Sequence, residues 1–153
     1  SDAETQEVIE KMDVIIKPDG WIIPQETIDI HGITNEKALE VGIPETEAVQ
    51  MLIDMWVRNG VTAERVAYNK TFDQRIIRIA MKRYFDEEIM NKWAVKDDHH
   101  CAMRMDAKLR KAKQRKLVDA YKDVCGKELE GAHNAMADAE ATHELYYKLV
   151  SLA

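Results

Sequence analysis

The sequence has 153 residues, with 22 Lys and Arg against 28 Asp and Glu, so its formal net charge is −6. Hydrophobic residues make up 46% of the chain and charged residues 33%, a balance typical of a folded globular protein and not of a disordered one. The negative charge argues against general coating of nucleic acids, which needs a positive field, but it allows a site where bound cations meet phosphates. The apolar runs are too short to span a bilayer, so we expect no membrane partner.

The two cysteines, Cys101 and Cys125, lie far apart in the sequence and form no CxxC pair. With no signal peptide ahead of them, they indicate reduced thiols in a cytoplasmic protein. A length of 153 residues is about that of one domain, so we expect residues 1–153 to form a single domain.

The first part of the chain predicts extended segments. Residues 8–17 indicate one strand, or the end of one strand followed by another, with the Val-Ile-Ile run at 14–16 buried in the core. Pro-Asp-Gly at 18–20 is typical of a turn. We expect residues 21–30 to be extended as well, with Pro24 keeping them away from a central position in a sheet.

Two helices are predicted next. Thr34 can cap a short helix that Gly42 ends, and a longer helix then runs from Pro44 to Asn59-Gly60. The apolar positions of the longer helix recur at helical spacing, and they are Ala48, Met51, Leu52, Met55 and Trp56. We interpret its methionines as core filling.

The second half of the chain predicts one short strand, at 65–68, and several helices. These helices are expected at residues 72–84, 101–112, 116–124 and from 135 to the C-terminus. Residues 86–100 are polar and poorly patterned, so we expect mostly loop there, with one helical turn near Ile89. Strands early, helices alternating with strands later and a helix at the end predict an α/β layer fold with a mixed sheet.

The last predicted helix carries an acid on its apolar face. Asn134 suits the N-cap of this helix. The apolar stripe that follows consists of Ala135, Thr142, Leu145, Leu149 and Leu152. Asp138 lies on this stripe, five residues after His133. Because a carboxylate on a face directed to the core is costly unless it is paired or bound to metal, Asp138 is the best functional candidate.

Asp73 repeats this pattern in the first turn of the helix that follows the short strand. The residues three, four, seven and eleven positions further on are Ile76, Ile77, Ala80 and Tyr84. A single aspartate at this position is also explained by the helix dipole, which it complements. Two such acids, one with a histidine upstream, favour a divalent-metal site on a nucleic-acid enzyme, since carboxylate oxygens suit Mg²⁺ or Mn²⁺.

Three segments resemble the motifs of one family. Residues 68–73, Tyr-Asn-Lys-Thr-Phe-Asp, resemble the second motif of the DnaQ-like, DEDDh-type 3′–5′ exonucleases. Residues 133–138, which follow the pattern H-x-A-x-x-D, resemble the third motif with its histidine. Residues 31–34, His-Gly-Ile-Thr, are similar to the family's segment near the 3′-terminal nucleotide. The resemblance extends from about Met12 to the C-terminus.

The resemblance implies a ribonuclease H-like fold, with a mixed sheet flanked by helices, and hydrolysis of nucleic acid from its 3′ end to nucleoside monophosphates. It implies that Asp73 and Asp138 bind Mg²⁺ or Mn²⁺, in a two-metal site in the complete domain. His133 would be the general base that takes a proton from the attacking water, since imidazole exchanges protons near neutral pH. The residues implied in substrate binding are His31, Gly32, Ile33, Thr34, Asn69 and Phe72.

The implied partner is the 3′ end of single-stranded nucleic acid, and a DNA polymerase subunit is a further candidate partner. The preference for DNA over RNA depends on analogy with the family alone. Two other functions stay open at this point. One is a non-catalytic DnaQ-like module that binds a 3′ end or a polymerase, and the other is an RNA-trimming 3′–5′ exoribonuclease.

The family's first motif, a D-x-E pair on a central strand, has no clear counterpart. Asp2-Ala3-Glu4 has the right letters, but only seven residues separate Glu4 from Met12, and the segment is polar where a central strand should be hydrophobic. We interpret residues 1–7 as a connection between the second and third strands. We therefore expect the chain to lack the first strand of an N-terminally incomplete domain, and to cut poorly by itself.

Two further polar segments were considered as sites. Residues 97–101, Asp-Asp-His-His-Cys, are interpreted as solvated loop and strand start, because no second cluster at zinc spacing accompanies them. Residues 104–116 hold seven basic residues and one acid, Asp106. This run is either a solvated helix face or a phosphate-contacting flank that includes Arg110, Lys111 and Arg115, and the sequence favours neither.

Overall fold

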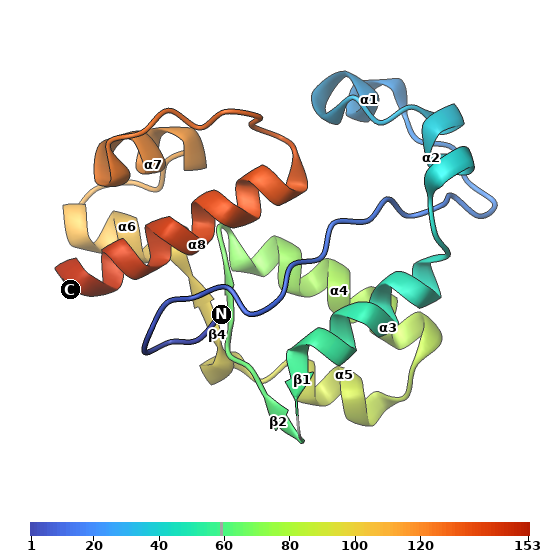
Figure 1. Cartoon of the computed structure of the whole chain (residues 1–153), viewed down its shortest axis with the longest axis horizontal. Coiled ribbons are helices and arrows are strands. Elements are labelled where there is room, and N and C mark those ends of the chain that lie inside the picture. The colour runs from blue at the N-terminus through green and yellow to red at the C-terminus, as the bar shows by residue number, and fades with distance from the viewer. Residues whose placement is uncertain (59) are drawn as a thin grey trace. The chain divides into compact units, whose positions relative to one another are not determined.

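The computed structural model describes residues 1–58 and 60–153, and it divides into two compact units, Ser1–Thr62 and Ala63–Ala153. Figure 1 labels the helices and strands of both units. Within the described ranges, no helix has the length and apolar character needed to cross a membrane.

The first unit is mainly helical. Its helices are α1 (Gln25–His31), α2 (Asn35–Val41) and α3 (Glu45–Trp56), and its strands, β1 (Val57–Arg58) and β2 (Val61–Thr62), form an antiparallel pair. The predicted cap of α2 is confirmed, because the side chain of Thr34 accepts a hydrogen bond of 3.1 Å from the backbone N–H of Lys37. The predicted end of α2 at Gly42 is also confirmed.

The strand predicted at residues 8–17 is wrong. The segment makes one isolated parallel bridge, in which the N–H of Lys17 donates to the carbonyl of Ile43 at 2.7 Å and the N–H of Ile43 donates to that of Ile15 at 2.8 Å. Ile16 is 39% exposed, so the expected core position is wrong as well. The reason is that a strand needs a neighbour along its length, and among the described residues only Ile43 bridges to this segment.

Gly42 allows this bridge to form. A β-carbon at this position would lie 2.2 Å from the carbonyl oxygen of Ala38 and 2.7 Å from the backbone nitrogen of Lys17. Its φ of −70° is ordinary, so the glycine is needed for the close approach of two backbones and not for a left-handed turn.

The extended segment predicted at residues 21–30 is also wrong beyond Pro24. Pro24 instead caps α1, where its fixed φ and missing N–H cost nothing. The backbone N–H of Ile23 donates to the side-chain oxygen of Asn35 at 2.7 Å, and the side-chain nitrogen of Asn35 donates to the Ile23 carbonyl at 3.1 Å. These two bonds satisfy the backbone groups of Ile23, which a neighbouring strand would bind if residues 21–30 were a strand.

Helix α3 is confirmed, but its buried face is displaced from the predicted one. The buried residues are Ala48, Val49, Ile53 and Trp56. Met51 is 42% exposed, whereas Leu52 and Met55 are half-buried. Apolar residues form two adjacent stripes on this helix, so periodicity alone does not decide which stripe is covered. The helix ends at Trp56, before the end predicted at Asn59-Gly60. Asn59 lies outside the described residues.

The second unit contains a parallel strand pair and the larger helices. Strand β3 (Arg65–Ala67) pairs with β4 (His99–Cys101), with Arg65 opposite His99 and Ala67 opposite Cys101. The connection between the two strands contains α4 (Lys70–Tyr84), α5 (Glu87–Trp93) and the 3₁₀ helix η1 (Lys96–Asp98). After β4 come α6 (Ala102–Arg110), α7 (Leu117–Cys125) and α8 (Ala135–Leu152).

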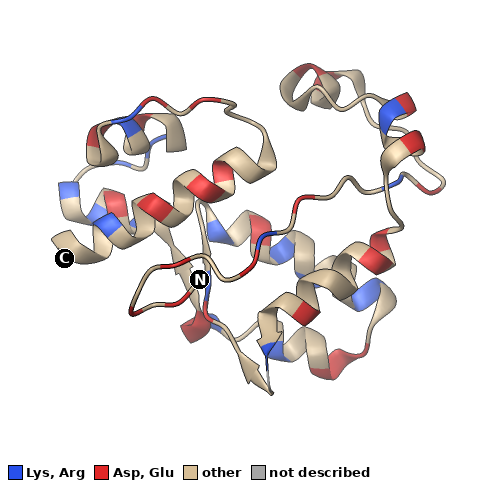
Figure 2. Cartoon of the chain, viewed as in Figure 1, with Lys and Arg blue, Asp and Glu red and all other residues tan. Residues whose placement is uncertain are grey.

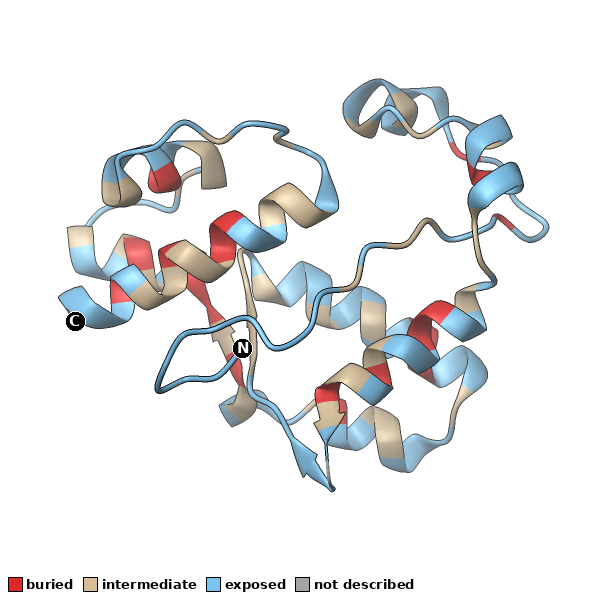
Figure 3. Cartoon of the chain, viewed as in Figure 1, coloured by how far each residue is buried: buried red, intermediate tan, exposed pale blue. Residues whose placement is uncertain are grey.

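The core of the second unit lies where α8 packs against β3, α6 and α7. Its fully buried members are Ala102, Ala120, Leu145 and Leu149. Figure 3 shows buried positions on α6, α7 and α8. The predicted stripe of α8 is confirmed for Thr142, Leu145 and Leu149, but its first and last members, Ala135 and Leu152, are exposed because they lie at the helix ends.

Strand β3 and helices α4, α6, α7 and α8 lie where the sequence predicts them. The helical turn predicted near Ile89 is confirmed and extends to the whole of α5, whereas the loop predicted over most of residues 86–100 is wrong, because α5, η1 and the start of β4 occupy the segment. Asp86 caps α5 by accepting a hydrogen bond of 3.0 Å from the N–H of Ile89. The described residues therefore form an α/β structure rich in helix, with one antiparallel and one parallel strand pair.

Candidate functional site

The chain turns sharply between β3 and the helix that carries Asp73. Asn69, the residue before α4, has the left-handed conformation, with φ of 69°, and its side chain does not cap the helix. Asn69 and Phe72 are both exposed, Phe72 by 61%. Asp73 lies in the first turn of α4. Helix α4 packs against both β3 and β4, so the position of this turn is set by the strand pair.

The carboxylate of Asp73 has no internal partner among the described residues. Asp73 is exposed as a whole residue, but its carboxyl group is partly surrounded by protein atoms, and this burial raises its pKa above the usual range. The predicted inward face of α4 is only partly confirmed. Ala80 is buried and Ile77 half-buried, whereas Ile76 and Tyr84 are exposed, so Asp73 lies at the edge of the covered side.

Asp138 lies in the first turn of α8, as predicted. Asn134 is the N-cap of this helix and accepts a hydrogen bond of 3.1 Å from the N–H of Ala137. Asp138 is half-buried, and its carboxylate, like that of Asp73, takes no hydrogen bond or ion pair from the described part of the chain. Its backbone carbonyl accepts a hydrogen bond of 2.8 Å from the hydroxyl of Thr142.

His133 lies on the loop directly before α8. It is exposed and has a φ of 71°, an unusual conformation for a residue with a side chain. The loop turns there because the N–H of Asn134 donates to the carbonyl of Gly131 at 2.9 Å. Helices α4 and α8 both pack against β3, so the structure brings the two acid-bearing helices to the same strand.

Residues 31–34 belong to the first unit, where their polar groups hold a local turn. Nδ1 of His31 accepts a hydrogen bond of 2.9 Å from the N–H of Ile33. Gly32 ends α1 with φ of 72°, and Thr34 caps α2. The segment therefore has a defined loop shape between two short helices.

Asp2 and Glu4 do not lie on a strand. The side-chain oxygen of Asp2 accepts hydrogen bonds from the N–H groups of Glu4, at 2.8 Å, and Thr5, at 3.0 Å. The N–H of Asp2 donates to the carbonyl of Glu7 at 2.9 Å, which closes a turn. Hydrogen bonds from the backbone N–H groups of Thr5 and Glu4 lower the pKa of the Asp2 carboxyl.

The chemistry of the candidate acids fits a hard divalent cation. Over residues 1–58 and 60–153, no group of three or more His, Cys, Asp and Glu side chains is arranged to hold a metal ion. Asp73 and Asp138 nevertheless each offer carboxylate oxygens that no positively charged side chain of the described residues binds. Mg²⁺ is commonly bound through one or two carboxylates together with waters and substrate phosphates, so such a donor set suits it.

The polar segment at residues 97–101 has a structural role, and part of its interpretation was wrong. It does contain the start of β4, but His99 and Cys101 are buried and not solvated. Nε2 of His99 donates to the carbonyl of Trp93 at 2.5 Å, and the sulfur of Cys101 accepts from the N–H of Lys70 at 3.5 Å. These groups are therefore occupied within the fold.

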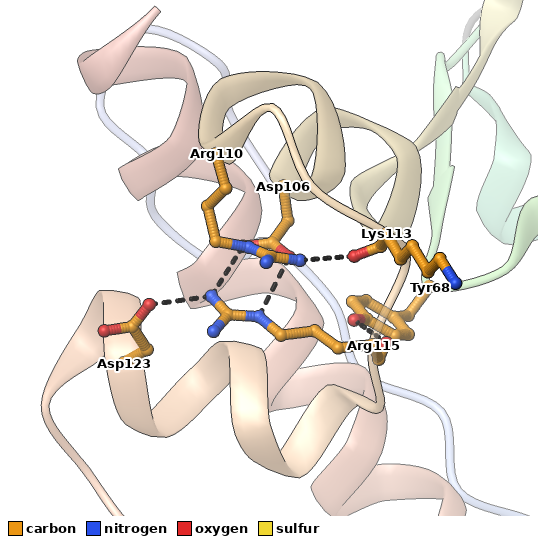
Figure 4. Close-up of polar contacts among 6 residues, drawn as sticks. All are labelled: Tyr68, Asp106, Arg110, Lys113, Arg115 and Asp123. Atoms are coloured by element: carbon orange, nitrogen blue, oxygen red, sulfur yellow. Dashed lines mark hydrogen bonds and ion pairs between the residues drawn. The ribbon is translucent and has the colours of Figure 1, made fainter.

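The basic run at residues 104–116 contains a buried acid that the sequence analysis did not identify as structural. The Asp106 side chain is 1% exposed, and it binds the guanidinium groups of both Arg110 and Arg115 (Figure 4). Arg115 also pairs with Asp123 at 2.9 Å. The hydroxyl of Tyr68 donates to the backbone carbonyl of Arg115. Burial, the largest effect, together with the charge of Asp106, raises the pKa of Tyr68 to about 12, so the hydroxyl remains a donor.

This arrangement answers one question that the sequence left open. Arg110 and Arg115 are neither a solvated face nor free phosphate ligands, because each is held by Asp106. A single acid within a strongly basic run was the signal that could have predicted it. Lys111, the third residue considered for a phosphate-contacting flank, is exposed.

Comparisons with known proteins agree on one family. The model of the family RNase_T, described as exonuclease, matches residues 1–146. A solved structure of exonuclease I is 26% identical to the chain and superposes with a TM-score of 0.75, covering 99% of this chain and 35% of that chain. This similarity shows the ribonuclease H-like α/β fold that the sequence predicts. No curated protein matches the sequence.

Two further structures are of the E. coli enzyme. Exonuclease I in complex with a dA16 oligonucleotide is 21% identical, with a TM-score of 0.73, and covers 99% of this chain and 35% of that chain. The zinc-bound form of an ExoI–ssDNA complex is 21% identical, with a TM-score of 0.71, and covers 99% and 34%. The chain thus spans about a third of the length of the solved proteins that it resembles.

Proposed function

Since the chain belongs to the RNase_T exonuclease family, we propose that it is a divalent-metal-dependent 3′–5′ exonuclease that releases nucleoside monophosphates from single-stranded DNA. The main structural support for this proposal is the position of two acidic residues. Asp73 and Asp138 each lie in the first turn of a helix packed against β3, and neither carboxylate has a cationic partner among the described residues. The dA16 complex of E. coli exonuclease I supports single-stranded DNA as the substrate class.

The proposed mechanism assigns a separate task to each side chain. Asp73 and Asp138 hold Mg²⁺ or Mn²⁺ through their carboxylate oxygens. When bound, the cation lowers the pKa of a water molecule and offsets the charge of the phosphodiester. His133 takes the proton of the attacking water at an imidazole nitrogen. The new P–O bond forms at the phosphorus that links the last two nucleotides, as its bond to O3′ of the penultimate nucleotide breaks. That O3′ leaves with the bonding electrons and takes a proton from solvent.

Substrate contacts are assigned to residues beside the acids and to the turn in the first unit. The exposed ring of Phe72 is adjacent to Asp73 in the sequence and offers an apolar surface on which a terminal base can stack. Asn69 presents an exposed amide directly before α4. His31, Gly32, Ile33 and Thr34 of the first unit are proposed as separate substrate contacts.

The test is release of mononucleotides from a 5′-labelled oligodeoxythymidine in Mn²⁺, followed as a ladder that shortens from the 3′ end. Asp73→Asn, Asp138→Asn and His133→Ala should each lower the rate about 100-fold or more, since a general base alone contributes 10²–10⁴-fold. Asp119→Asn is the matched control, because Asp119 is also an acid in the first turn of a helix.

The possible outcomes separate the alternatives. Full activity in the Asp138→Asn and His133→Ala variants would contradict the site assignment. Binding of the oligonucleotide by the full-length protein without any release would assign it to the non-catalytic modules. Faster trimming of a matched RNA than of the DNA would identify an exoribonuclease.

A further inference from the structure

The seven basic residues between positions 104 and 116 do not form one uniform surface. Arg110 and Arg115 share the carboxylate of Asp106, and Arg115 also pairs with Asp123, as described above. Arg104 lies at the other end of α6, in its first turn, and is exposed. Figure 2 shows basic residues on both α6 and α4, the two helices that Arg104 connects.

The side chain of Arg104 reaches the motif that carries Asp73. Its Nη2 donates a hydrogen bond of 3.2 Å to the hydroxyl of Thr71. Thr71 lies two residues before Asp73 in the first turn of α4. Helices α4 and α6 both pack against β3, so the contact joins two elements that are fixed on the same strand.

Most N–H donors of the Arg104 guanidinium have no acceptor among the described residues. An arginine side chain carries five N–H donors, and the described residues occupy one of them, through Thr71. No carboxylate in the described part of the chain pairs with it, in contrast to Arg110 and Arg115. A fixed positive charge with free, planar donors therefore lies beside the helix turn of Asp73.

We propose that Arg104 binds a backbone phosphate of the nucleic-acid strand next to the Asp73 end of α4. The planar guanidinium matches two phosphate oxygens, and the bond to Thr71 orients it before the strand arrives. A local cation is needed there because the chain as a whole has a net charge of −6 and repels a polyanion. The inference rests on the proposed function, since it assumes a nucleic-acid substrate.

The test measures binding of a fluorescein-labelled oligodeoxythymidine in EDTA, where no cleavage occurs, as a function of salt. Arg104→Gln should raise Kd about tenfold and reduce the slope of log K against log salt by about 0.7, the loss of one phosphate contact on a single strand. Arg104→Lys should restore the slope but not the full affinity, because an ammonium cannot bind two oxygens in one plane.

Arg78→Gln is the matched control. Arg78 is an exposed arginine of the same helix as Thr71, two turns or about 10 Å further along it, and its loss changes the net charge equally. We expect its Kd to stay within twofold of wild type. Thr71→Val tests the orienting bond and should raise Kd about threefold without changing the salt slope.

Equal effects of Arg104→Gln and Arg78→Gln would overturn the proposal, since only net charge would then matter. An unchanged Kd for Arg104→Gln would also overturn it, while wild-type binding and cleavage would leave the proposed function intact. If the wild-type chain neither binds nor cuts the oligonucleotide at low salt, the proposed function fails and the role of Arg104 fails with it.

Discussion

Replacement of Asp106 by Asn should destabilise the second unit more than any other single change of charge in the α6–α7 region. The Asp106 side chain is 1% exposed and accepts four hydrogen bonds from guanidinium groups. Arg110 donates through Nε at 3.0 Å and Nη2 at 2.9 Å, and Arg115 through Nε at 3.0 Å and Nη2 at 2.8 Å. An asparagine keeps the shape but brings an amide N–H₂ towards donors of the same kind.

The magnitude follows from what remains after the charge is removed. Removal of one partner of a fully buried ion pair costs about 3–5 kcal/mol of unfolding free energy. The side chains of Arg110 and Arg115 are 27% and 21% exposed, so water can partly solvate them once Asp106 is neutral. We therefore expect a loss of about 2–3 kcal/mol, a large share of the stability of an ordinary domain.

The assay is urea unfolding at pH 7, followed by circular dichroism, with Asp123→Asn as the control. Asp123 also pairs with Arg115, but its side chain is 63% exposed, so its loss should cost less than about 1 kcal/mol. A loss for Asp106→Asn no larger than that for Asp123→Asn would refute the reasoning, because burial would then add nothing to the pair.

The pH dependence of the same variant gives an independent check. Burial opposes ionisation of Asp106, but hydrogen bonds from Arg115 and Arg110 outweigh it and hold the pKa of the carboxyl below its usual range. A group whose folded pKa is lowered stabilises the protein fully above its unfolded pKa, and that stabilisation is lost as pH falls through the folded value. The difference between wild type and Asp106→Asn should therefore shrink below about pH 4.

Two further predictions concern local contacts. Asn134→Ala removes the cap of α8 and should lower the free energy of unfolding, measured in urea, by about 1 kcal/mol. The control is Asn91→Ala, within α5, which should have little effect. Equal losses in the two variants would contradict the capping role. Burial lowers the pKa of His99, although the hydrogen bond to the Trp93 carbonyl acts in the opposite direction. The free energy of unfolding should therefore be highest above about pH 6.5 and fall as the solution is acidified. In thermal melts, His99→Gln should reduce the difference between the Tm at pH 8 and the Tm at pH 5. An unchanged difference would contradict the role assigned to His99.

The features that the sequence predicted correctly depend on near neighbours in the chain. Thr34 and Asn134 cap helices through N–H groups three residues away. The positions of Asp73 and Asp138 in first turns were predicted for the same reason. Such signals are local, so no knowledge of the rest of the fold is required.

The features that it predicted wrongly depend on distant partners. Residues 8–17 have the composition of a strand, but a strand exists only beside another one. Asp106 is the single acid of a basic run, which is a signal for pairing, but its burial depends on the folded α6–α7 region, where Arg110 and Arg115 close over it. For Asp73, periodicity did not show which side of α4 is covered, so the exposure of Ile76 and Tyr84 was missed.

The parallel pairing of β3 with β4 has a consequence for how the candidate site is assembled. Arg65 and His99 are opposite each other although they are 34 positions apart in the sequence. The chain must therefore close a long loop, including α4 and α5, before the strand that leads to Asp73 has its neighbour. Asp73 thus acquires its final surroundings only when this loop has closed, and a short peptide that contains the motif would not reproduce them.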